Sequence, residues 1–374
     1  MSAETARLAA EDSRHMLTAL ALATRALGQV WPNPAVGCVL VKDGDVVRRG
    51  WTRRGGRPHA EAEALAAAGD LAKGASLYVS LEPCNHFGKT PPCAEAIIAA
   101  GVARVVVAVG DPDPRVNGGG LARLRQAGIE VSVGVRREEA AELNAGFFLR
   151  CMKGRPLFTL KMATSLDGRI ATRTGESKWI TGKLARRVVH RMRSSHDAVL
   201  IGSQTALADD PDLGCRLPGM SNRSPVRIIA DGRLRLTAAS RLVMTASQMP
   251  TWVVTQADAD AGSRAELAQH GVTLVLLEPR TPTRLDPEDI ARALGESGLT
   301  RVLIEGGGCL AASFLAAGLI DRLAWFHGPC ILGADAVPAA AAMSEDALDR
   351  TPTFNRSDVA AFGNDVLEML SRVS

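Results

Sequence analysis

The sequence predicts two consecutive α/β domains, residues 1–150 and residues 151–374. Three observations support this prediction. The chain has 374 residues, more than one hydrophobic core usually organises, so two domains are expected. Helical and strand-like patterns alternate in both halves, as in sheets covered by helices. The segment 150–156 (RCMKGRP) follows a charged helical stretch, and we place the domain boundary there.

The first half begins with an amphipathic helix that runs from Ser13 to Gly28, with Asp12 or Ser13 as its expected N-cap. The Asp-Gly pair at residues 43–44 then predicts a hairpin between strands at 36–41 and 46–47. Helices and strands alternate after the hairpin, at helix 58–68, strand 77–80, helix 91–100, strand 105–109, helix 121–127, strand 130–133 and helix 138–149.

The second half shows short apolar runs separated by helical stretches. Apolar runs of this length that alternate with helices are typical of a buried sheet in an α/β domain. The strands expected here are at 157–162, 198–201, 226–230, 252–255 and 302–304.

Composition and charge argue against several functional classes. Hydrophobic residues make up 46% of the chain and the formal net charge is +4, without a block of like charges that could bind nucleic acid or a membrane surface. The N-terminal segment carries acidic residues and lacks the basic start of a signal peptide. No apolar run reaches the roughly 18 residues of a membrane span. We expect a cytoplasmic protein that acts on a small anionic molecule.

Cysteine usage points to thiol or metal chemistry. The chain has seven cysteines, an odd number that argues against a disulfide framework in a chain without a secretion signal. Two of them, Cys84 and Cys93, belong to the pattern described next. We interpret the following cysteines as packing or neutral residues: Cys38, Cys151, Cys215 and Cys309.

A histidine, a glutamate and two cysteines form a candidate metal site. His59 and Glu61 stand two apart at the start of one helix, and Cys84 and Cys93 precede and begin the next. An imidazole and two thiolates are typical zinc ligands, and three protein ligands leave the fourth position for water, whose pKa the metal lowers toward neutrality. Glu61 is then the proton shuttle. Deamination of a nucleobase needs this set of groups.

Local sequence suggests how the ligands are presented. We expect Pro58 to start the helix so that His59 lies just inside it. We expect Thr90 to cap the second helix, Pro91 to be its first residue and Cys93 to lie in its first turn, where the helix dipole favours a thiolate.

Other interpretations of the four residues stay open. His-x-Glu alone is common on helix surfaces, and Cys84 and Cys93 alone are compatible with buried thiols. His86 is a competing ligand, although a residue two past Cys84 would have to fold back onto the same cation. A structural zinc module is a further alternative, but such a site usually fills all four positions with protein atoms.

The segment 81–93 (LEPCNHFGKTPPC) resembles the extended deaminase motif of the bifunctional riboflavin-biosynthesis deaminase/reductase family. Its Gly-basic-Thr-Pro-Pro-Cys insertion sets that family apart from cytidine and tRNA-adenosine deaminases. Segments 32–37 (PNPAVG), 59–61 (HAE) and 111–120 (DPDPRVNGGG) resemble other motifs of the family. The resemblance implies that His59, Cys84 and Cys93 hold zinc and that Glu61 is the acid/base.

The resemblance continues through the second half. Segments 161–169 (KMATSLDGR), 175–181 (GESKWIT), 209–216 (DDPDLGCR) and 305–308 (EGGG) are similar to the family's reductase motifs. The resemblance implies a cytidine-deaminase-like α/β/α domain followed by a dihydrofolate-reductase-like α/β domain. It places substrate contacts at Ser177, Arg193, Leu213, Arg216 and Glu305. It places cofactor contacts at Ala163, Trp179, Thr205, Asp209, Gly307 and Gly308.

Residue chemistry agrees with part of this assignment. Arg193 and Arg216 offer planar donor forks suited to a ribose phosphate. Glycines after strand 302–304 let the backbone approach a pyrophosphate, although Gly-x-Gly-x-x-Ala alone is a weak dinucleotide motif. Lys161, Asp209 and Glu305 are the polar candidates to assist hydride transfer, and the sequence does not choose among them.

Three positions depart from the family pattern. Glu63 stands where His or Asn is common, Gly214 replaces a usual Thr, and Cys330 stands where a basic residue is frequent. None of the three is a predicted metal ligand. Glu63 adds a negative charge near Glu61, so its effect on Glu61 or on substrate contact is open.

We therefore expect zinc-dependent hydrolytic deamination of an amino-pyrimidine that carries a phosphoribosylamino arm, followed by NADPH-dependent reduction of the ribosyl group to ribityl. We expect a homo-oligomer, a dimer or a tetramer. Two alternatives are a deaminase with an inactive reductase half and a deaminase acting on nucleic acid. The second needs basic and aromatic residues for single-strand binding, and this chain has a single tyrosine.

Overall fold

The computed structural model describes residues 3–88, 91–281, 284–344 and 346–373. The chain forms two compact units, Met1–Gly154 and Arg155–Ser374. No helix in the described ranges combines the length and the apolar content that crossing a bilayer requires.

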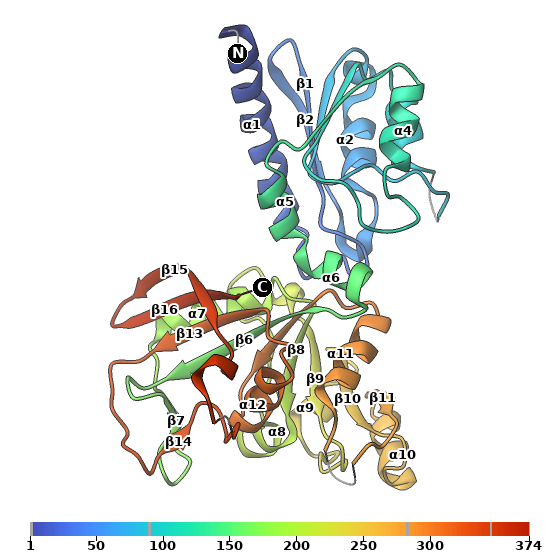
Figure 1. Cartoon of the computed structure of the whole chain (residues 1–374). Helices are drawn as coiled ribbons and strands as arrows, with labels where there is room; N and C mark the ends of the chain where they lie inside the picture. The colour runs from blue at the N-terminus through green and yellow to red at the C-terminus, as the bar shows by residue number, and fades with distance from the viewer. Residues whose placement is uncertain (1–2, 89–90, 282–283, 345, 374) are drawn as a thin grey trace. The chain divides into compact units, whose positions relative to one another are not determined.

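A five-stranded sheet forms the centre of the first unit (Figure 1). Its strands are β1 (Gly37–Lys42), β2 (Asp45–Trp51), β3 (Ser76–Val79), β4 (Arg104–Val107) and β5 (Glu130–Val133). The order is β2-β1-β3-β4-β5, with β1 antiparallel to both neighbours and β3, β4 and β5 parallel to one another. The carboxyl ends of β2, β3 and β4 therefore lie at the same edge of the sheet.

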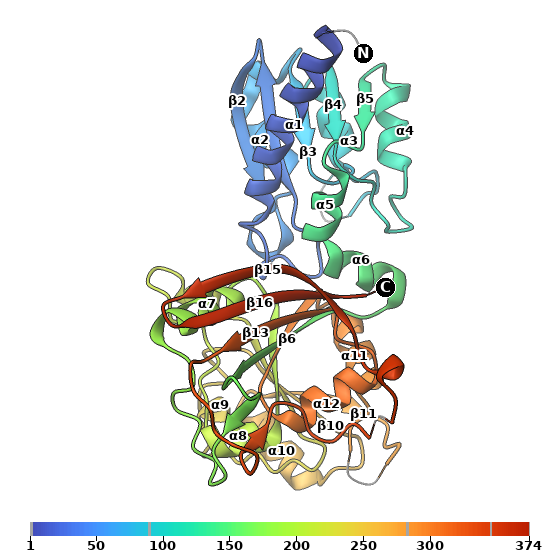
Figure 2. The ribbon, with the colours of Figure 1, turned by 60° about the vertical axis from the view of Figure 1, so that its left-hand side comes forward.

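Helices cover both faces of this sheet, as predicted. They are α1 (Ala3–Ala23), α2 (Ala60–Ala68), α3 (Cys93–Ala99), α4 (Gly119–Gln126), α5 (Arg137–Leu143) and α6 (Ala145–Lys153), with short 3-10 helices at η1 (Arg54–Gly56) and η2 (Gly69–Ala72). α1 and α5 lie on one face, and α2, α3 and α4 lie on the other (Figures 1 and 2). α1 contacts β1 so closely that a β-carbon added at Gly37 would lie 1.9 Å from the carbonyl oxygen of Ala19.

Several of the predicted helix boundaries are wrong. The first helix begins at Ala3 and ends at Ala23, so Asp12 lies inside it and is not its N-cap. The stretch predicted as one helix at 138–149 forms α5 and α6, which meet at Asn144. The buried amide of Asn144 accepts a hydrogen bond from the backbone N–H of Ala35 at 2.9 Å and donates one to its carbonyl at 3.0 Å. This pairing fixes Asn144 where the two helices meet.

A nine-stranded sheet forms the centre of the second unit (Figure 2). Its order is β11-β10-β9-β8-β12-β6-β13-β16-β15, and a separate pair joins β14 and β7. The strands are β6 (Leu157–Thr164), β7 (Arg169–Ala171), β8 (Ala198–Gly202), β9 (Val226–Ala230), β10 (Thr251–Gln256), β11 (Thr273–Leu277), β12 (Arg301–Glu305), β13 (Arg322–His327), β14 (Val337–Pro338), β15 (Phe354–Phe362) and β16 (Asp365–Arg372). The strands from β11 to β13 are parallel to one another, whereas β16 is antiparallel to both of its neighbours, β13 and β15.

The helices of the second unit pack on this sheet through apolar side chains. They are α7 (Lys183–Arg193), α8 (Ser203–Asp209), α9 (Arg241–Met244), α10 (Ala261–Gln269), α11 (Pro287–Glu296) and α12 (Gly308–Ala316), with η3 (Ser221–Arg223) and η4 (Leu348–Arg350). On α7, Ala185 and Val189 pack against Phe326 of β13 and Leu367 of β16. On α12, Phe314 packs edge-on against Phe158 of β6 with ring centroids 5.0 Å apart. The carboxyl ends of the central parallel strands lie at one edge of the sheet, where α/β proteins commonly bind ligands.

A buried ion pair holds α1 to the first sheet. Asp12 accepts hydrogen bonds from the Tyr78 hydroxyl at 2.9 Å and from two nitrogens of Arg104 at 2.8 Å each. Burial acts to raise the pKa of Asp12, but the hydrogen bonds from Arg104 and Tyr78 bring it below its ordinary value. The carboxylate therefore stays charged and paired in the folded chain.

We predict that Asp12→Asn lowers the free energy of unfolding of the first unit by about 3 kcal/mol, because Arg104 loses its buried counter-charge. Hydrogen exchange of β3 and β4 peptides in the full chain measures this change. Glu139→Gln is the control, since the exposed Glu139 pairs with Arg136 on the surface and should contribute less than about 1 kcal/mol. Equal exchange in the two variants would contradict the prediction.

Candidate functional site

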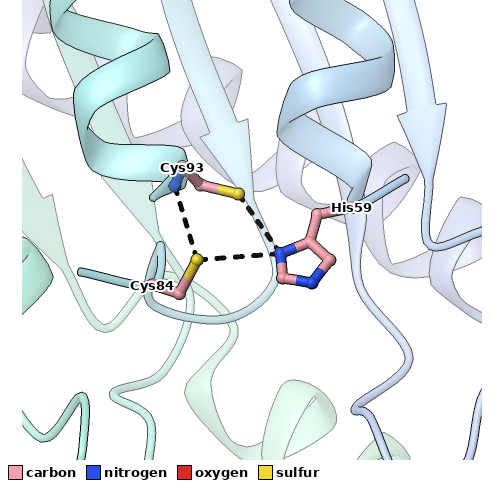
Figure 3. A group of neighbouring side chains, drawn as sticks. All are labelled: His59, Cys84 and Cys93. Carbon is pink, nitrogen blue, oxygen red and sulfur yellow. Dashed lines mark hydrogen bonds between the residues drawn. The ribbon is translucent and has the colours of Figure 1, made fainter. Parts of the chain in front are cut away.

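Three side chains from separate segments of the first unit meet at one edge of its sheet. His59 follows β2 and precedes α2, Cys84 follows β3, and Cys93 is the first residue of α3. Figure 3 shows the three side chains pointing toward one another. His59 Nδ1 lies 3.3 Å from Cys93 Sγ and 3.7 Å from Cys84 Sγ, and the three ligand atoms all lie within 4.8 Å of one another. Among the described residues no other such group of three occurs.

The separations fit a single zinc ion. Tetrahedral zinc with Zn–N near 2.0 Å and Zn–S near 2.3 Å places nitrogen and sulfur ligands about 3.6 Å apart. The two nitrogen–sulfur distances lie on either side of this value. One imidazole and two sulfurs also match the ligand types that zinc prefers, and a fourth position is left for a non-protein ligand.

The electrostatic environment of His59, Cys84 and Cys93 shifts their pKa values. A hydrogen bond with Cys93 is the largest cause that lowers the pKa of Cys84 to about 4, with His59 acting in the same direction against burial. A hydrogen bond to Cys84 raises the pKa of His59, although burial opposes it. Interaction with Cys84, together with burial, raises the pKa of Cys93. The lowered pKa favours the thiolate form of Cys84, which is the form that binds a metal ion.

Glu61 lies beside the three ligands as the second residue of α2, and it is 3% exposed. Burial is the main cause that raises its pKa to about 7, and the negative charge of Cys84 acts in the same direction, while His59 opposes both. A carboxyl group whose pKa is near neutrality can both take up and release a proton at the working pH. Glu61 therefore has the properties of a general acid/base.

The helix starts differ from the prediction. His59 is the N-cap of α2 and lies just before the helix, not inside it. α3 begins at Cys93 with Pro92 as its N-cap, so Pro91 is not its first residue. Thr90, the predicted cap, lies outside the described residues. Both ligands still stand at helix N-termini, where the dipole favours negative charge.

The structure also shows what surrounds His86 and Glu63, two residues near the predicted ligands. His86 is not a member of the group of three. Its Nδ1 is buried without a hydrogen-bond partner among the described residues. Glu63 accepts hydrogen bonds from Arg53 and from the backbone N–H of Trp51 at 3.0 Å, and Arg53 stacks on the Trp51 ring. The negative charge of Glu63 is therefore compensated on the β2 side of the helix.

The second unit places charged groups on β12 and on its neighbour β6. Lys161 and Glu305 are partners in the parallel register of these strands. The Arg193 guanidinium from α7 donates to the two carboxylate oxygens of Glu305 at 2.6 and 2.9 Å. Burial lowers the pKa of Lys161. Burial acts to raise the pKa of Glu305, but Arg193 and Lys161 bring it below its ordinary value.

The segment 212–216 is held against this ion pair. The carbonyl oxygen of Gly214 accepts a hydrogen bond from Arg193 Nη1 at 3.1 Å and lies 3.1 Å from His190 Nδ1. Leu213 is buried, whereas Arg216 is exposed. Arg193, Leu213, Arg216 and Glu305 are therefore brought together. Three of the five N–H groups of the Arg193 guanidinium bind Glu305 and Gly214.

Three of the predicted cofactor residues, Thr205, Gly307 and Gly308, form a second cluster after β8 and β12. Thr205 on α8 faces the glycine turn, since β-carbons added at Gly306 and Gly307 would lie 3.2 and 3.1 Å from its side chain. Gly308 begins α12, and the backbone of residues 338–341 passes close to it. Asp209 ends α8 and is exposed.

The other predicted residues lie on neighbouring segments. Ala163 on β6 pairs with Phe326 of β13. Ser177 lies between β7 and α7. Trp179, in the same connection, is 67% exposed and stacks on the Arg186 guanidinium at 4.1 Å. No hydrogen bond or ion pair given for the described residues joins these three to the Arg193–Glu305 pair.

Two residues of these sites were not predicted from the sequence. His190 lies one turn before Arg193 on α7 and contacts the same carbonyl, and its spacing of three from a predicted contact was the available signal. Glu82 is 4% exposed although it is charged. A carboxylate inside the apolar run before Pro83 and Cys84 was the signal there, because a buried charge requires partners.

Comparison with known proteins assigns the chain to a family. A model of the cytidine and deoxycytidylate deaminase zinc-binding region matches residues 9–109, and a model of the RibD C-terminal domain matches residues 156–367. The riboflavin biosynthesis protein RibD of Bacillus amyloliquefaciens is 43% identical, covering 88% of this chain and 87% of that protein. The chain belongs to the RibD family.

Other RibD proteins match over nearly the full length. RibD of Escherichia coli K12 is 42% identical and covers 95% of this chain and 98% of that protein. The structure of Acinetobacter baumannii RibD superposes with a TM-score of 0.87 at 38% identity, covering 98% of this chain and 100% of that chain. A Thermotoga maritima diaminohydroxyphosphoribosylaminopyrimidine deaminase/5-amino-6-(5-phosphoribosylamino)uracil reductase gives a TM-score of 0.85 at 36% identity, with coverage of 98% and 99%.

As a RibD-family chain, the protein is a bifunctional enzyme of riboflavin biosynthesis, with a zinc-binding deaminase domain followed by a reductase domain. The predicted fold class and the predicted type of enzyme are confirmed. The alternatives of a nucleic-acid deaminase and of a silent reductase half gain no support from these matches.

We predict that the purified chain binds one zinc ion and that Cys84→Ser reduces zinc content to less than about a tenth, because a hydroxyl is a poor replacement for a thiolate ligand. Elemental analysis after dialysis measures the content. Cys151→Ser is the matched control, since Cys151 lies in the same unit and outside the group of three, and it should keep its zinc. A fully loaded Cys84→Ser variant would contradict the assignment.

Proposed function

We propose that the first unit hydrolyses the 2-amino group of 2,5-diamino-6-(5-phosphoribosylamino)pyrimidin-4-one. The second unit then reduces the ribosyl group of the deaminated product to ribityl, giving 5-amino-6-(5-phosphoribitylamino)uracil. The observation that carries the proposal is the convergence of His59, Cys84 and Cys93 beside a buried Glu61. The family's deaminase and reductase domains support it.

Within the first unit, we assign His59, Cys84 and Cys93 as zinc ligands and Glu61 as the catalytic acid/base. Bound zinc supplies Lewis-acid chemistry that makes water a nucleophile near neutral pH. Glu61 takes the proton that the attacking water loses and passes it to the departing amino group. The oxygen of water bonds to C2 of the pyrimidine, the C2–N bond breaks, and ammonia leaves. The burial of Glu61 keeps bulk water from competing for this proton.

Within the second unit, we assign NADPH as the hydride donor. Bound NADPH would supply a hydride to C1′ of the ribosyl group; the bond from C1′ to the ring oxygen would then break, and that oxygen would take up a proton. Alignment of the two carbons is the main requirement of this step. Residues proposed to contact the cofactor are Ala163, Trp179, Thr205, Asp209, Gly307 and Gly308. Residues proposed to contact the substrate are Ser177, Arg193, Leu213, Arg216 and Glu305.

The proposed division of labour follows the two compact units. We assign residues 1–150 to the deaminase and residues 151–374 to the reductase, a division supported by the change of unit after Gly154. The cytoplasmic location and the homo-oligomeric state stay predictions from the sequence.

A coupled assay tests both activities in one reaction. With the diamino-pyrimidine and NADPH, we expect one NADPH consumed for each ammonia released, with ammonia appearing first. Removal of zinc should abolish ammonia release but leave NADPH oxidation intact when the deaminated pyrimidine is supplied. Full-rate deamination without zinc would refute the first step. Ammonia release without NADPH or NADH consumption would refute the second.

The Arg193–Glu305 pair gives a second prediction. Arg193→Lys keeps the positive charge but loses the two parallel hydrogen bonds that orient Glu305, so reductase kcat/KM should fall by about tenfold or more. Arg191→Lys is the control, because Arg191 is an exposed arginine on the same helix, and deaminase activity is the internal reference. An unchanged kcat/KM in Arg193→Lys would contradict a role for this pair.

A further inference from the structure

The carboxylate of Glu82 accepts four backbone hydrogen bonds from one loop and the helix that follows it. Its Oε2 accepts from the N–H of Asp111 at 3.3 Å and of Gly118 at 3.1 Å. Its Oε1 accepts from the N–H of Gly120 at 3.0 Å and of Leu121 at 3.2 Å. A single buried side chain thus closes the loop 111–118 at both of its ends.

The same carboxylate supplies the cap that α4 lacks locally. The N-cap of α4 is Gly118, which has no side chain to accept a hydrogen bond from the first turn. Gly120 and Leu121 are the second and third residues of the helix, whose N–H groups have no partner within it. Glu82 binds both, and its negative charge also suits the positive end of the helix dipole. The cap therefore comes from the segment after β3, remote in sequence from α4.

Glu82 is joined directly to a zinc ligand of the proposed site. Only Pro83 separates it from Cys84. The first turn of α4 lies directly on this connection, since a β-carbon added at Gly120 would lie 1.9 Å from the carbonyl oxygen of Pro83. The backbone N–H of Glu82 binds the carbonyl of Val109 at 3.0 Å, and the Cys84 carbonyl accepts from Ala94 at 3.1 Å. The chain on both sides of the Cys84 sulfur is thus fixed.

We propose that Glu82 is a positioning residue of the deaminase: by capping α4 and closing the loop 111–118, it holds Cys84 where its sulfur meets His59 and Cys93. This inference rests on the proposed zinc site and deaminase function. Without the carboxylate, four N–H groups, two of them buried, lose their acceptor. The loop and the Cys84 segment also lose their common anchor. The metal should then be bound less tightly, with a distorted ligand geometry, while the second unit is unaffected.

The test compares Glu82→Gln with Glu95→Gln in the full chain. Glu95 makes a surface ion pair with Arg123 that also links α3 to α4, so it is matched in chemistry and in neighbourhood. Three properties are measured: Zn²⁺ affinity by competition with a chelator, the absorption spectrum of the Co²⁺-substituted chain, and hydrogen exchange of peptides covering residues 111–121. Reductase activity reports that the second unit is intact.

For Glu82→Gln we expect zinc affinity to fall about 10- to 100-fold, the thiolate-to-cobalt bands to change, and exchange at 111–121 to accelerate. Glu95→Gln should match the unchanged chain in all three. Faster exchange with an unaltered cobalt spectrum and zinc affinity would overturn the inference, because Glu82 would then only stabilise the loop. If the unchanged chain neither binds zinc nor deaminates, the proposed function fails instead.

A second variant covers the case in which Glu82→Gln does not fold. Glu82→Asp keeps the charge but is one methylene shorter, so it cannot reach all four N–H groups. It should give intermediate zinc affinity and intermediate exchange at 111–121. Affinity equal to that of the unchanged chain, with exchange accelerated, would again overturn the inference.

Discussion

The deaminase half depends on one constraint, which is that the ends of three strands bring an imidazole, two sulfurs and a carboxyl group to the same edge of a sheet. β2 leads to His59 and Glu61, β3 leads to Cys84, and β4 leads to the loop that Glu82 closes. Because these strands run in one direction, their carboxyl ends lie at the same edge of the sheet. Sheet topology therefore places the reacting groups, and helix N-termini and backbone hydrogen bonds orient them.

The reductase half uses the same principle with different chemistry. Parallel β6 and β12 put Lys161 beside Glu305, the last residue of β12, and α7 adds Arg193. Glycines after β12 leave room for Thr205 of α8 to approach the backbone. The two halves differ in what holds their central groups. A shared cation is proposed for the first, whereas a bidentate ion pair is present in the second.

Local signals in the sequence were sufficient for much of the fold and for the three side chains that converge in the first unit. The Asp-Gly hairpin and the alternating helices and strands are where periodicity placed them, because local pattern and tertiary contacts agree there. Sequence reasoning failed where long-range contacts decide. β16 (DVLEMLSR) has the composition of a helix and is a strand because it pairs with β13 and β15. β11, β13 and β15 were also missed, and nothing local announces the pairing of Arg193 with Glu305.

The most direct test of the account is X-ray absorption spectroscopy at the zinc edge of the purified chain. The proposed zinc site predicts two sulfur atoms near 2.3 Å and two lighter atoms near 2.0 to 2.1 Å, with the multiple-scattering signature of one imidazole. A spectrum with no sulfur, with more than two sulfurs, or with two imidazoles would contradict it. The fourth position would then be absent or closed, and the hydrolytic chemistry of the first unit would lose its basis.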